Sequence, residues 1–134
     1  MNTKVFNSEN GITREIVGAT IEVHRTLGGP GLLESVYEES LSWEMSHRGL
    51  LVERQLQVPI SYKGNPLTSP LRLDMLVEKK VIVECKATTQ YNKIFEAQLL
   101  TYLRLLDLRV GLVINFGEKY VKRGIHRVVN KFDQ

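Results

Sequence analysis

The stretch LRLDMLVEKKVIVECK, residues 71–86, decides the fold. Apolar and polar residues alternate on both sides of its polar tip at 78–80, which predicts two strands joined by a turn. A register symmetric about Lys79 would put Asp74 opposite Glu84, where cross-strand Cβ atoms lie roughly 4.5–5.5 Å apart. Lys86 would share the strand face of Glu84. The hairpin therefore predicts a hard-cation site with an ammonium beside it, unless a slip of one residue turns Asp74 away.

The composition is that of a soluble globular protein, with 43% hydrophobic and 25% charged residues. We expect one domain spanning residues 1–134. The net charge of +3 permits an anionic partner without requiring one. The lone Cys85 cannot form an internal disulfide, and no Cys/His cluster offers a zinc site. Because the sequence shows neither an apolar leader nor a long apolar run, we expect a cytoplasmic protein with no membrane partner.

Two helices are predicted before the hairpin. Apolar spacing indicates one over about 12–27, capped by Asn10 or Thr13 and ended by the GGPG turn at 28–31. The second is expected from about Leu32 to His47, with Glu34 in its first turn. Its predicted buried residues are Leu33, Val36, Tyr37, Leu41 and either Trp43 or Met45.

Further strands and one helix complete the expected order. Residues 51–52 and 57–62 look extended, and 63–66 should be a turn. A third helix is expected over 93–106, with Ile94, Ala97 and Leu103 among its packing residues. VGLVINF at 110–116 is typical of a central strand buried on both faces, and 124–129 of an edge strand. The predicted fold class is α/β, a mixed central sheet flanked by helices.

Two motifs support a family resemblance. Asp74 followed by Glu84-Cys85-Lys86 resembles the PD-(D/E)XK nuclease-like superfamily, in which an Asp and an E-x-K lie on adjacent strands. His24-Arg25 and GGPGLLESVYEESL at 28–41 are similar to the bacterial GxxExxY family, whose name matches Gly31, Glu34 and Tyr37. The likeness continues through EAQLLTYLRLLDLRVGLVINFG and RVVN. It implies a restriction-endonuclease-like core with two N-terminal helices. The chain departs from the pattern in one extra glycine at 28–29 and in Cys85, where an apolar residue is common.

The resemblance implies a metal-dependent hydrolase that cleaves phosphodiester bonds of DNA or RNA. Mg²⁺ or Mn²⁺ would be held by Asp74, Glu84 and the Cys85 carbonyl, with Lys86 orienting water or stabilising charge. Two alternatives remain: a non-catalytic nucleic-acid- or protein-binding module that keeps the fold, and a subunit that dimerises through its helices. The residues alone also fit a surface cluster of ion pairs.

Other residues have both a functional and a structural interpretation. Glu34 either reaches the metal ion or only interacts with the helix dipole. Gln98 and Tyr102 resemble the Q-x-x-x-Y element of RecB-like nucleases, although a tyrosine here also fits the core. Arg25 is a weak candidate for a phosphate contact. A basic group near the carboxyl-terminal end could touch a nucleic-acid backbone, but a solvated face is the simpler interpretation. This group comprises Lys119, Lys122, Arg123, Arg127 and Lys131.

Overall fold

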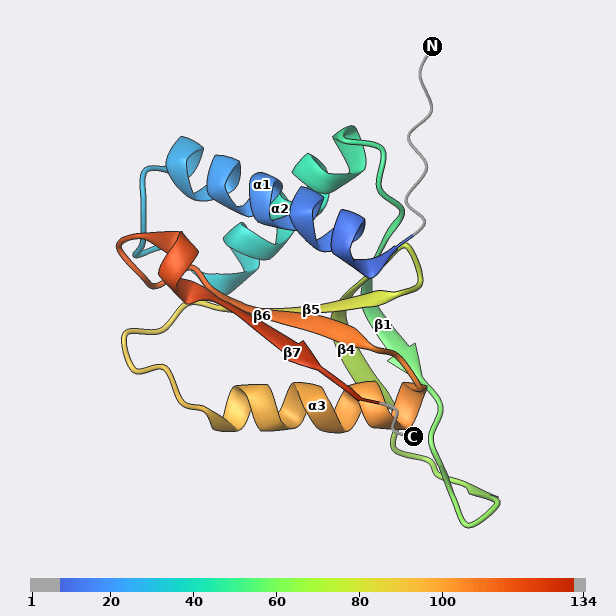
Figure 1. Ribbon diagram of the computed structural model, residues 1–134. Helices are drawn as coiled ribbons and strands as arrows, with labels where there is room; N and C mark the ends of the chain where they lie inside the picture. The colour runs from blue at the N-terminus through green and yellow to red at the C-terminus, as the bar shows by residue number, and fades with distance from the viewer. Residues whose placement is uncertain (1–7, 132–134) are drawn as a thin grey trace.

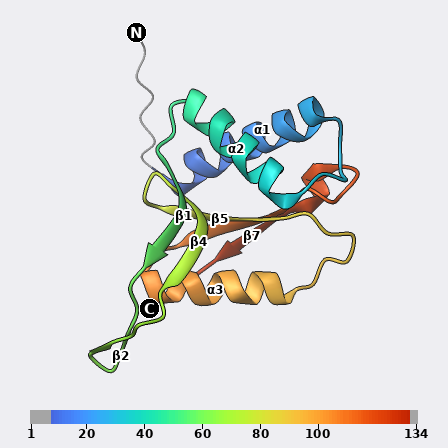
Figure 2. The ribbon, with the colours of Figure 1, turned by 180° about the vertical axis from the view of Figure 1, so that it is seen from behind.

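The computed structural model describes residues 8–131 as three layers, with two helices on one face of a sheet and one helix on the other (Figures 1 and 2). Among these residues no helix has the length and apolar character of a membrane span. The helices are α1 (Glu9–Leu27), α2 (Glu34–His47), α3 (Ile94–Leu106) and the short 3₁₀ turn η1 (Val121–Gly124). The strands are β1 (Val52–Val58), β2 (Ser61–Tyr62), β3 (Asn65–Pro66), β4 (Leu71–Val77), β5 (Val81–Lys86), β6 (Val110–Asn115) and β7 (Ile125–Val129).

The main sheet is mixed, as the sequence predicts. Its order is β1-β4-β5-β6-β7, and only the β5–β6 pair is parallel within the described part of the chain. Parallel neighbours need a long crossover, and α3 supplies it between β5 and β6. The β2–β3 hairpin projects away from the layers (Figure 1). β4 and β5 lie inside the main sheet. The residues of the β4–β5 hairpin are therefore positioned by neighbouring strands on both sides.

Apolar cores lie on both faces of the sheet. The α1–α2 core packs Ile16, Tyr37 and Leu41 against Met75, Val83 and Ile114. The α3 core packs Leu99 and Leu103 against Leu73, Ile82 and Val113. The sheet face therefore changes along β4, since Leu73 belongs to one core and Met75 to the other. The change falls at Asp74.

Some predicted details of the helices are wrong. The N-cap of α1 is Ser8, whose Oγ accepts a hydrogen bond from the Gly11 N–H at 3.2 Å, so neither Asn10 nor Thr13 caps it. Leu33 and Val36 are exposed rather than buried, because α2 begins only at Glu34 and turns this side to solvent. Trp43 is 61% exposed and stacks on His47, leaving Met45 to fill the core.

The remaining corrections concern short segments. β1 is continuous from Val52 to Val58, where the sequence predicts a break, because β4 supplies partners on both sides of Gln55. Asn65 and Pro66 form β3 and pair with β2, so the turn itself is shorter than predicted. Ile94 and Ala97 face solvent at the start of α3 instead of packing. The packing face of α3 is that of Leu99 and Leu103.

Candidate functional site

The β4–β5 hairpin has the register expected from its sequence. Met75 pairs with Val83, Leu76 with Ile82 and Val77 with Val81, which is symmetric about Lys79. Glu78 and Lys79 take positive φ angles of 53° and 55° in the turn. The ladder ends at the Met75–Val83 pair. Asp74 and Glu84 occupy the next facing positions, where the two strands no longer exchange backbone hydrogen bonds.

Beyond the Met75–Val83 pair, hydrogen bonds from backbone to side chain join β4 and β5 in place of backbone pairs. The Asp74 backbone N–H donates to Glu84 Oε2 at 2.9 Å. The Cys85 backbone N–H donates to Asp74 Oδ2, also at 2.9 Å. Each carboxylate thus accepts from the backbone of the opposite strand, which fixes both acids in a crossed arrangement. The backbone N–H and C=O of one strand residue point to the same side, so the Cys85 carbonyl also faces the opening between β4 and β5.

Burial and repulsion raise the pKa values of both acids. Glu84 is 7% exposed, and burial followed by the charge of Asp74 raises its pKa to about 8. Burial is also the main cause of the raised pKa of Asp74, with the Glu38 charge acting in the same direction. The Lys86 ammonium opposes both shifts. The pair therefore holds a proton near neutral pH, and a cation would relieve the same repulsion.

Glu38 belongs to this electrostatic group, and the sequence analysis missed it. Its side chain is almost completely buried and accepts hydrogen bonds from Gln55 Nε2 at 2.8 Å and Arg54 Nε at 3.3 Å. Gln55 has a positive φ of 48° and lies opposite Asp74 in the β1–β4 register. Glu38 therefore holds β1 in place beside Asp74, the position at which the buried side chains of β4 change from one core to the other. One signal was available, because Glu38 follows Glu34 by four residues on the same helix face.

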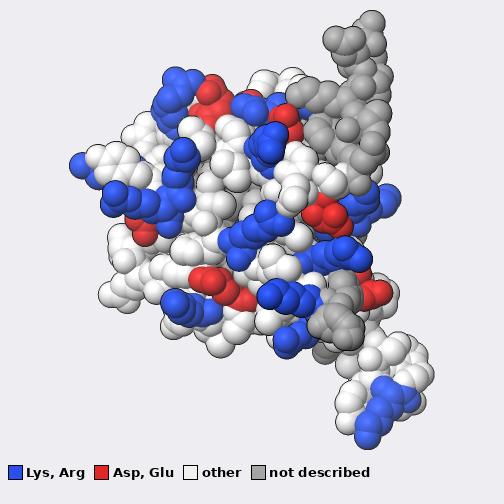
Figure 3. Space-filling view, viewed as in Figure 1, with Lys and Arg blue, Asp and Glu red and all other residues white. Residues whose placement is uncertain are grey.

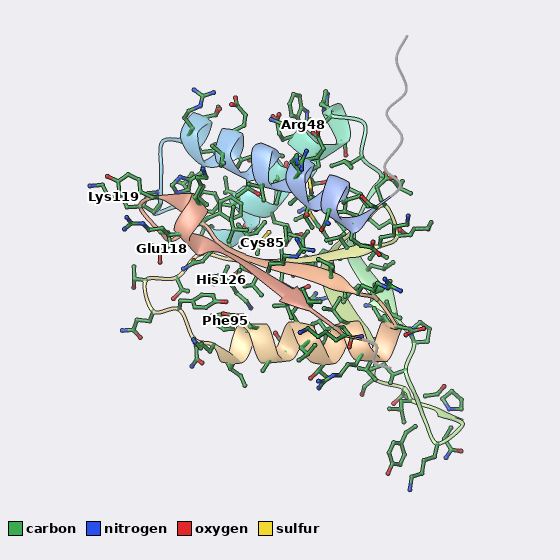
Figure 4. The ribbon with its side chains drawn as sticks, viewed as in Figure 1. Arg48, Cys85, Phe95, Glu118, Lys119 and His126 are labelled. Carbon is green, nitrogen blue, oxygen red and sulfur yellow. The ribbon has the colours of Figure 1, made fainter. Side chains whose placement is uncertain are left out.

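Lys86 is held at the end of β5. Its Nζ lies 4.5 Å from the centre of the Phe95 ring, a cation–π contact. Figure 4 shows Phe95 near the start of α3, on the same side of the sheet as His126. Tyr91 joins the two, since its ring stacks on His126 at 4.1 Å and meets Phe95 edge-on at 5.3 Å. The Lys86 carbonyl also accepts from the Phe116 N–H at 2.8 Å.

Three further predicted residues surround the acids. Glu34 lies in the first turn of α2, and its pKa is raised by burial and then by the charge of Asp74. The pKa of Tyr102 is raised by burial and then by the charges of Glu84 and Asp74, while its hydrogen bond with Gln98 opposes the rise. The structure thus brings α2, β4, β5 and α3 together around the two carboxylates.

Arg25 and Tyr37 lie outside this group. Arg25 forms an ion pair with Glu22 on its own helix and is largely exposed. Tyr37 is buried, and its hydroxyl donates to the Gly29 carbonyl at 2.7 Å and accepts from the Leu32 N–H at 3.1 Å. Tyr37 therefore fixes the glycine-rich turn, and through it the start of α2 that carries Glu34.

Cys85 is a core residue rather than a nucleophile. Its side chain is fully buried against the α1–α2 layer, as Figure 4 shows, and burial strongly raises the pKa of its thiol. The predicted apolar role of this side chain is confirmed. Its backbone is what contributes to the site.

The donor set suits a hard cation. Within residues 8–131 no three His, Cys, Asp or Glu side chains are placed to bind one ion together. The available protein ligands are Asp74, Glu84 and the Cys85 carbonyl, all of them oxygens. Mg²⁺ and Mn²⁺ prefer oxygen ligands, and Mg²⁺ usually retains several waters, so an incomplete protein cage fits these ions.

Comparison with known proteins gives one finding. A family model described as the PD-(D/E)XK nuclease superfamily matches residues 10–128. No curated protein and no solved structure matches the chain. The matched range includes the acids at the end of the hairpin and, apart from the first residue of α1 and the last of β7, both N-terminal helices and every strand of the main sheet.

Proposed function

The chain belongs to the PD-(D/E)XK nuclease superfamily, and on that basis we propose that it hydrolyses phosphodiester bonds of DNA or RNA with Mg²⁺ or Mn²⁺ as cofactor. The observation that carries the proposal is the crossed pair of hydrogen bonds that holds Asp74 and Glu84 side by side, with Lys86 on the same strand end. Acids that only form ion pairs at the surface would not be expected to replace backbone pairs of the β4–β5 ladder. We further assign the chain to the bacterial GxxExxY family through Gly31, Glu34 and Tyr37.

Each side chain has a distinct part in the proposed reaction. Asp74, Glu84 and the Cys85 carbonyl would hold the cation, which would supply Lewis-acid polarisation and lower the pKa of water. Lys86 orients the attacking water and stabilises negative charge that develops on the phosphate oxygens. The water oxygen bonds to phosphorus while the bond to the leaving oxygen breaks, and the proton that the water releases is taken up by that oxygen, which becomes a hydroxyl. Gln98 and Tyr102 position the phosphate from α3, and Glu34 would reach the cation from α2.

Calorimetry tests the cation site directly. Mn²⁺ titrated into the wild-type chain should bind, and Asp74→Asn should abolish the heat because it removes one of two carboxylate ligands. Glu39→Gln is the matched control, since it removes an exposed carboxylate from α2 and should leave binding unchanged. Equal binding by wild type and Asp74→Asn would contradict the assignment of the ligands.

Cleavage assays test the reaction itself. Labelled DNA and RNA should be cut in Mg²⁺ or Mn²⁺, and Lys86→Ala should lower the rate at least about a hundredfold, as expected for loss of one preorganised electrostatic group. Lys63→Ala removes a remote lysine from the β2–β3 hairpin and should cut normally. Cation binding without cleavage by the wild type would favour the non-catalytic binding module. Cleavage that persists undiminished in both Lys86→Ala and Glu84→Gln would reveal a contaminating nuclease.

A further inference from the structure

A continuous groove runs between α1 and β7, on the side of the molecule seen in Figure 1. Two adjoining hollows of about 430 and 380 Å³ share Asn10 and Arg127 in their walls, so they form one surface depression. We call it the α1–β7 groove and define it by Asn10, Thr13, Arg14, Arg109, Arg127 and Lys131. Figure 3 shows Lys and Arg side chains gathered over this face.

The groove concentrates positive charge. Arg14, Arg109, Arg127 and Lys131 line it, against Glu9 as the one acidic lining residue among those described. The whole chain is nearly balanced by comparison, with 18 basic and 15 acidic residues. Basic residues are therefore concentrated in the α1–β7 groove rather than distributed evenly over the surface.

The opposite side of α1 has the reverse character. The groove between α1 and α2 is lined by Glu22, Glu39 and Glu44, and no Lys or Arg appears among its described lining residues. Two of these acids are ion-paired, Glu22 with Arg25 and Glu44 with Arg48. The described lining of this groove nevertheless includes no basic side chain, so an anionic ligand would be drawn to the β7 side of α1.

Arg127 is fixed at the centre of the groove. Its Nη2 donates to Asn10 Oδ1 at 2.7 Å, which ties β7 to the first turn of α1. A guanidinium carries five N–H donors, so this bond leaves donors for a ligand. Arg14 makes no hydrogen bond or ion pair with the described residues, and its charge is uncompensated by a direct partner. Asn10 adds a polar side chain to the lining, and its Oδ1 accepts the Arg127 hydrogen bond.

The groove is separate from the proposed catalytic acids. Asp74 and Glu84 lie where β4 and β5 diverge, whereas β7 is the far edge of the sheet, with β6 between β5 and β7. The groove therefore cannot be a wall of the acidic site. A ligand long enough to contact both must extend around the sheet edge, and a nucleic-acid strand meets that requirement.

We propose that the α1–β7 groove binds the sugar–phosphate backbone of a nucleic acid as an anchoring surface apart from the acids. The recognised chemistry is a row of phosphates, which Arg and Lys bind without reading bases. The surface accordingly supplies affinity and orientation rather than sequence preference. The choice of a nucleic acid as the ligand rests on the proposed function, although binding in the groove does not itself require cleavage.

Fluorescence anisotropy with the full chain tests the groove. Labelled single- and double-stranded DNA and RNA oligonucleotides are titrated in EDTA at several salt concentrations, so that neither a bound divalent ion nor cleavage contributes. Arg14→Gln should weaken binding roughly fivefold to tenfold at about 0.1 M salt, and should flatten the slope of log K against log salt by about 0.7 to 0.9. The triple variant Arg14→Gln, Arg127→Gln, Lys131→Gln should remove most of the binding.

Lys63→Gln is the matched control, because it also removes one exposed positive charge but from the β2–β3 hairpin. It should bind like the wild type. Arg14→Gln is preferred to Arg127→Gln as the single variant because it breaks no hydrogen bond in the fold. Circular dichroism melts of each variant check that folding is retained.

The outcomes separate this proposal from the proposed hydrolysis. Wild-type binding that falls in Arg14→Gln but not in Lys63→Gln supports the groove even if no cleavage is found. Equal affinities and equal salt slopes for wild type, Arg14→Gln and the triple variant would overturn it, even if the wild type cleaves. Absence of any nucleic-acid binding at low salt would overturn it as well.

Discussion

The raised pKa of Glu84 shows how one buried carboxyl can reveal the electrostatics of a candidate site. In the folded chain, burial and the charges of Asp74 and Glu38 raise its pKa, and the Asp74 backbone N–H and the Lys86 ammonium offset only part of that rise. Such an acid has two ways to lower its free energy, taking up a proton or binding a cation. Its protonation is therefore measurable in the stability of the fold, without any assay of function.

The stability of the protein should depend on pH through Glu84. Its pKa is about 8 in the folded chain against an ordinary 4.5. Between these values the unfolded chain has released the proton and the folded chain retains it, so the free energy of unfolding should fall as pH rises and level off above about pH 8. Replacing the carboxyl by an amide in Glu84→Gln removes this fall, giving a gain on the order of a few kcal/mol at pH 8.5 and little at pH 4.5.

Urea denaturation at a series of pH values measures this difference. Glu39→Gln, which alters an exposed carboxyl on α2, should follow the wild-type curve throughout. Parallel curves for wild type and Glu84→Gln would show that the pKa of Glu84 is not raised in the folded chain.

Phe95 should act as a positioning residue for Lys86. The ring lies 4.5 Å from Nζ, and contacts of this kind contribute about 0.5 to 2 kcal/mol. Phe95→Leu keeps an apolar side chain on α3 but removes the ring. We expect the cleavage rate at saturating substrate to fall about twofold to thirtyfold, while calorimetry shows unchanged Mn²⁺ binding because the carboxylates are untouched.

Tyr62→Leu is the comparison for Phe95→Leu, since Tyr62 also lies beneath a lysine, Lys63, on the remote β2–β3 hairpin. It should cleave normally. A loss of Mn²⁺ binding in Phe95→Leu would instead mean that the ring supports the acids as well as the lysine.

At the scale of elements, the connection after β5 keeps the site in register with β6. The buried Asn115 accepts from the Thr88 N–H and donates to the Thr88 carbonyl, both at 3.0 Å, and also accepts from the Gly117 N–H at 2.9 Å. Two segments far apart in sequence are thereby joined directly beyond Lys86. The lysine lies on a strand whose end is fixed from both sides.

Gly117→Ala should break this junction. A Cβ at position 117 would collide with the Thr88 carbonyl oxygen and lie 2.7 Å from the Thr88 nitrogen, and backbone atoms cannot move aside as a flexible side chain could. We expect a loss of at least about 1 to 3 kcal/mol in the free energy of unfolding, the range for forced overpacking. Gly11→Ala is the control, because its Cβ would meet Ser8 Oγ at an ordinary 3.5 Å within α1.

Equilibrium unfolding in urea distinguishes the two glycines. Gly11→Ala should be as stable as the wild type or gain roughly 0.5 to 1 kcal/mol, since alanine favours a helix interior. A wild-type midpoint for Gly117→Ala would mean that the loop at Thr88 is free to move, and that the junction does not fix Lys86.

The same elements show what the sequence alone could predict. The period of two in 71–86, together with the polar tip at 78–80, predicted the register of β4 and β5, which the structure confirms. The mixed sheet followed from an apolar strand after a helix. The sequence does not show that the ladder would stop at Asp74, where carboxylate hydrogen bonds replace the backbone pairs. Glu38 was missed because its partners lie 16 and 17 residues away.

At the scale of the whole molecule, the proposed cation site joins separate layers. Asp74 and Glu84 belong to the sheet, Glu34 and Glu38 to α2, and Tyr102 to α3. The charges of these residues act on one another across the layers. An ion held by the sheet acids would remove a repulsion that now opposes the packing of α2, so its binding should be visible as stability of the entire fold.

Mn²⁺ should therefore raise the melting temperature of the wild-type chain. A ligand that binds only the folded state adds about 2.7 kcal/mol at a hundred times its Kd, which corresponds to a shift of several degrees in a domain of this size. The shift at a fixed Mn²⁺ concentration should be larger at pH 8 than at pH 6, because the ion must displace the proton that Glu84 holds at the lower pH. Differential scanning calorimetry of wild type, Asp74→Asn and Glu39→Gln measures it. Glu39→Gln should respond as the wild type does, and an equal shift in Asp74→Asn would place the ion elsewhere on the molecule.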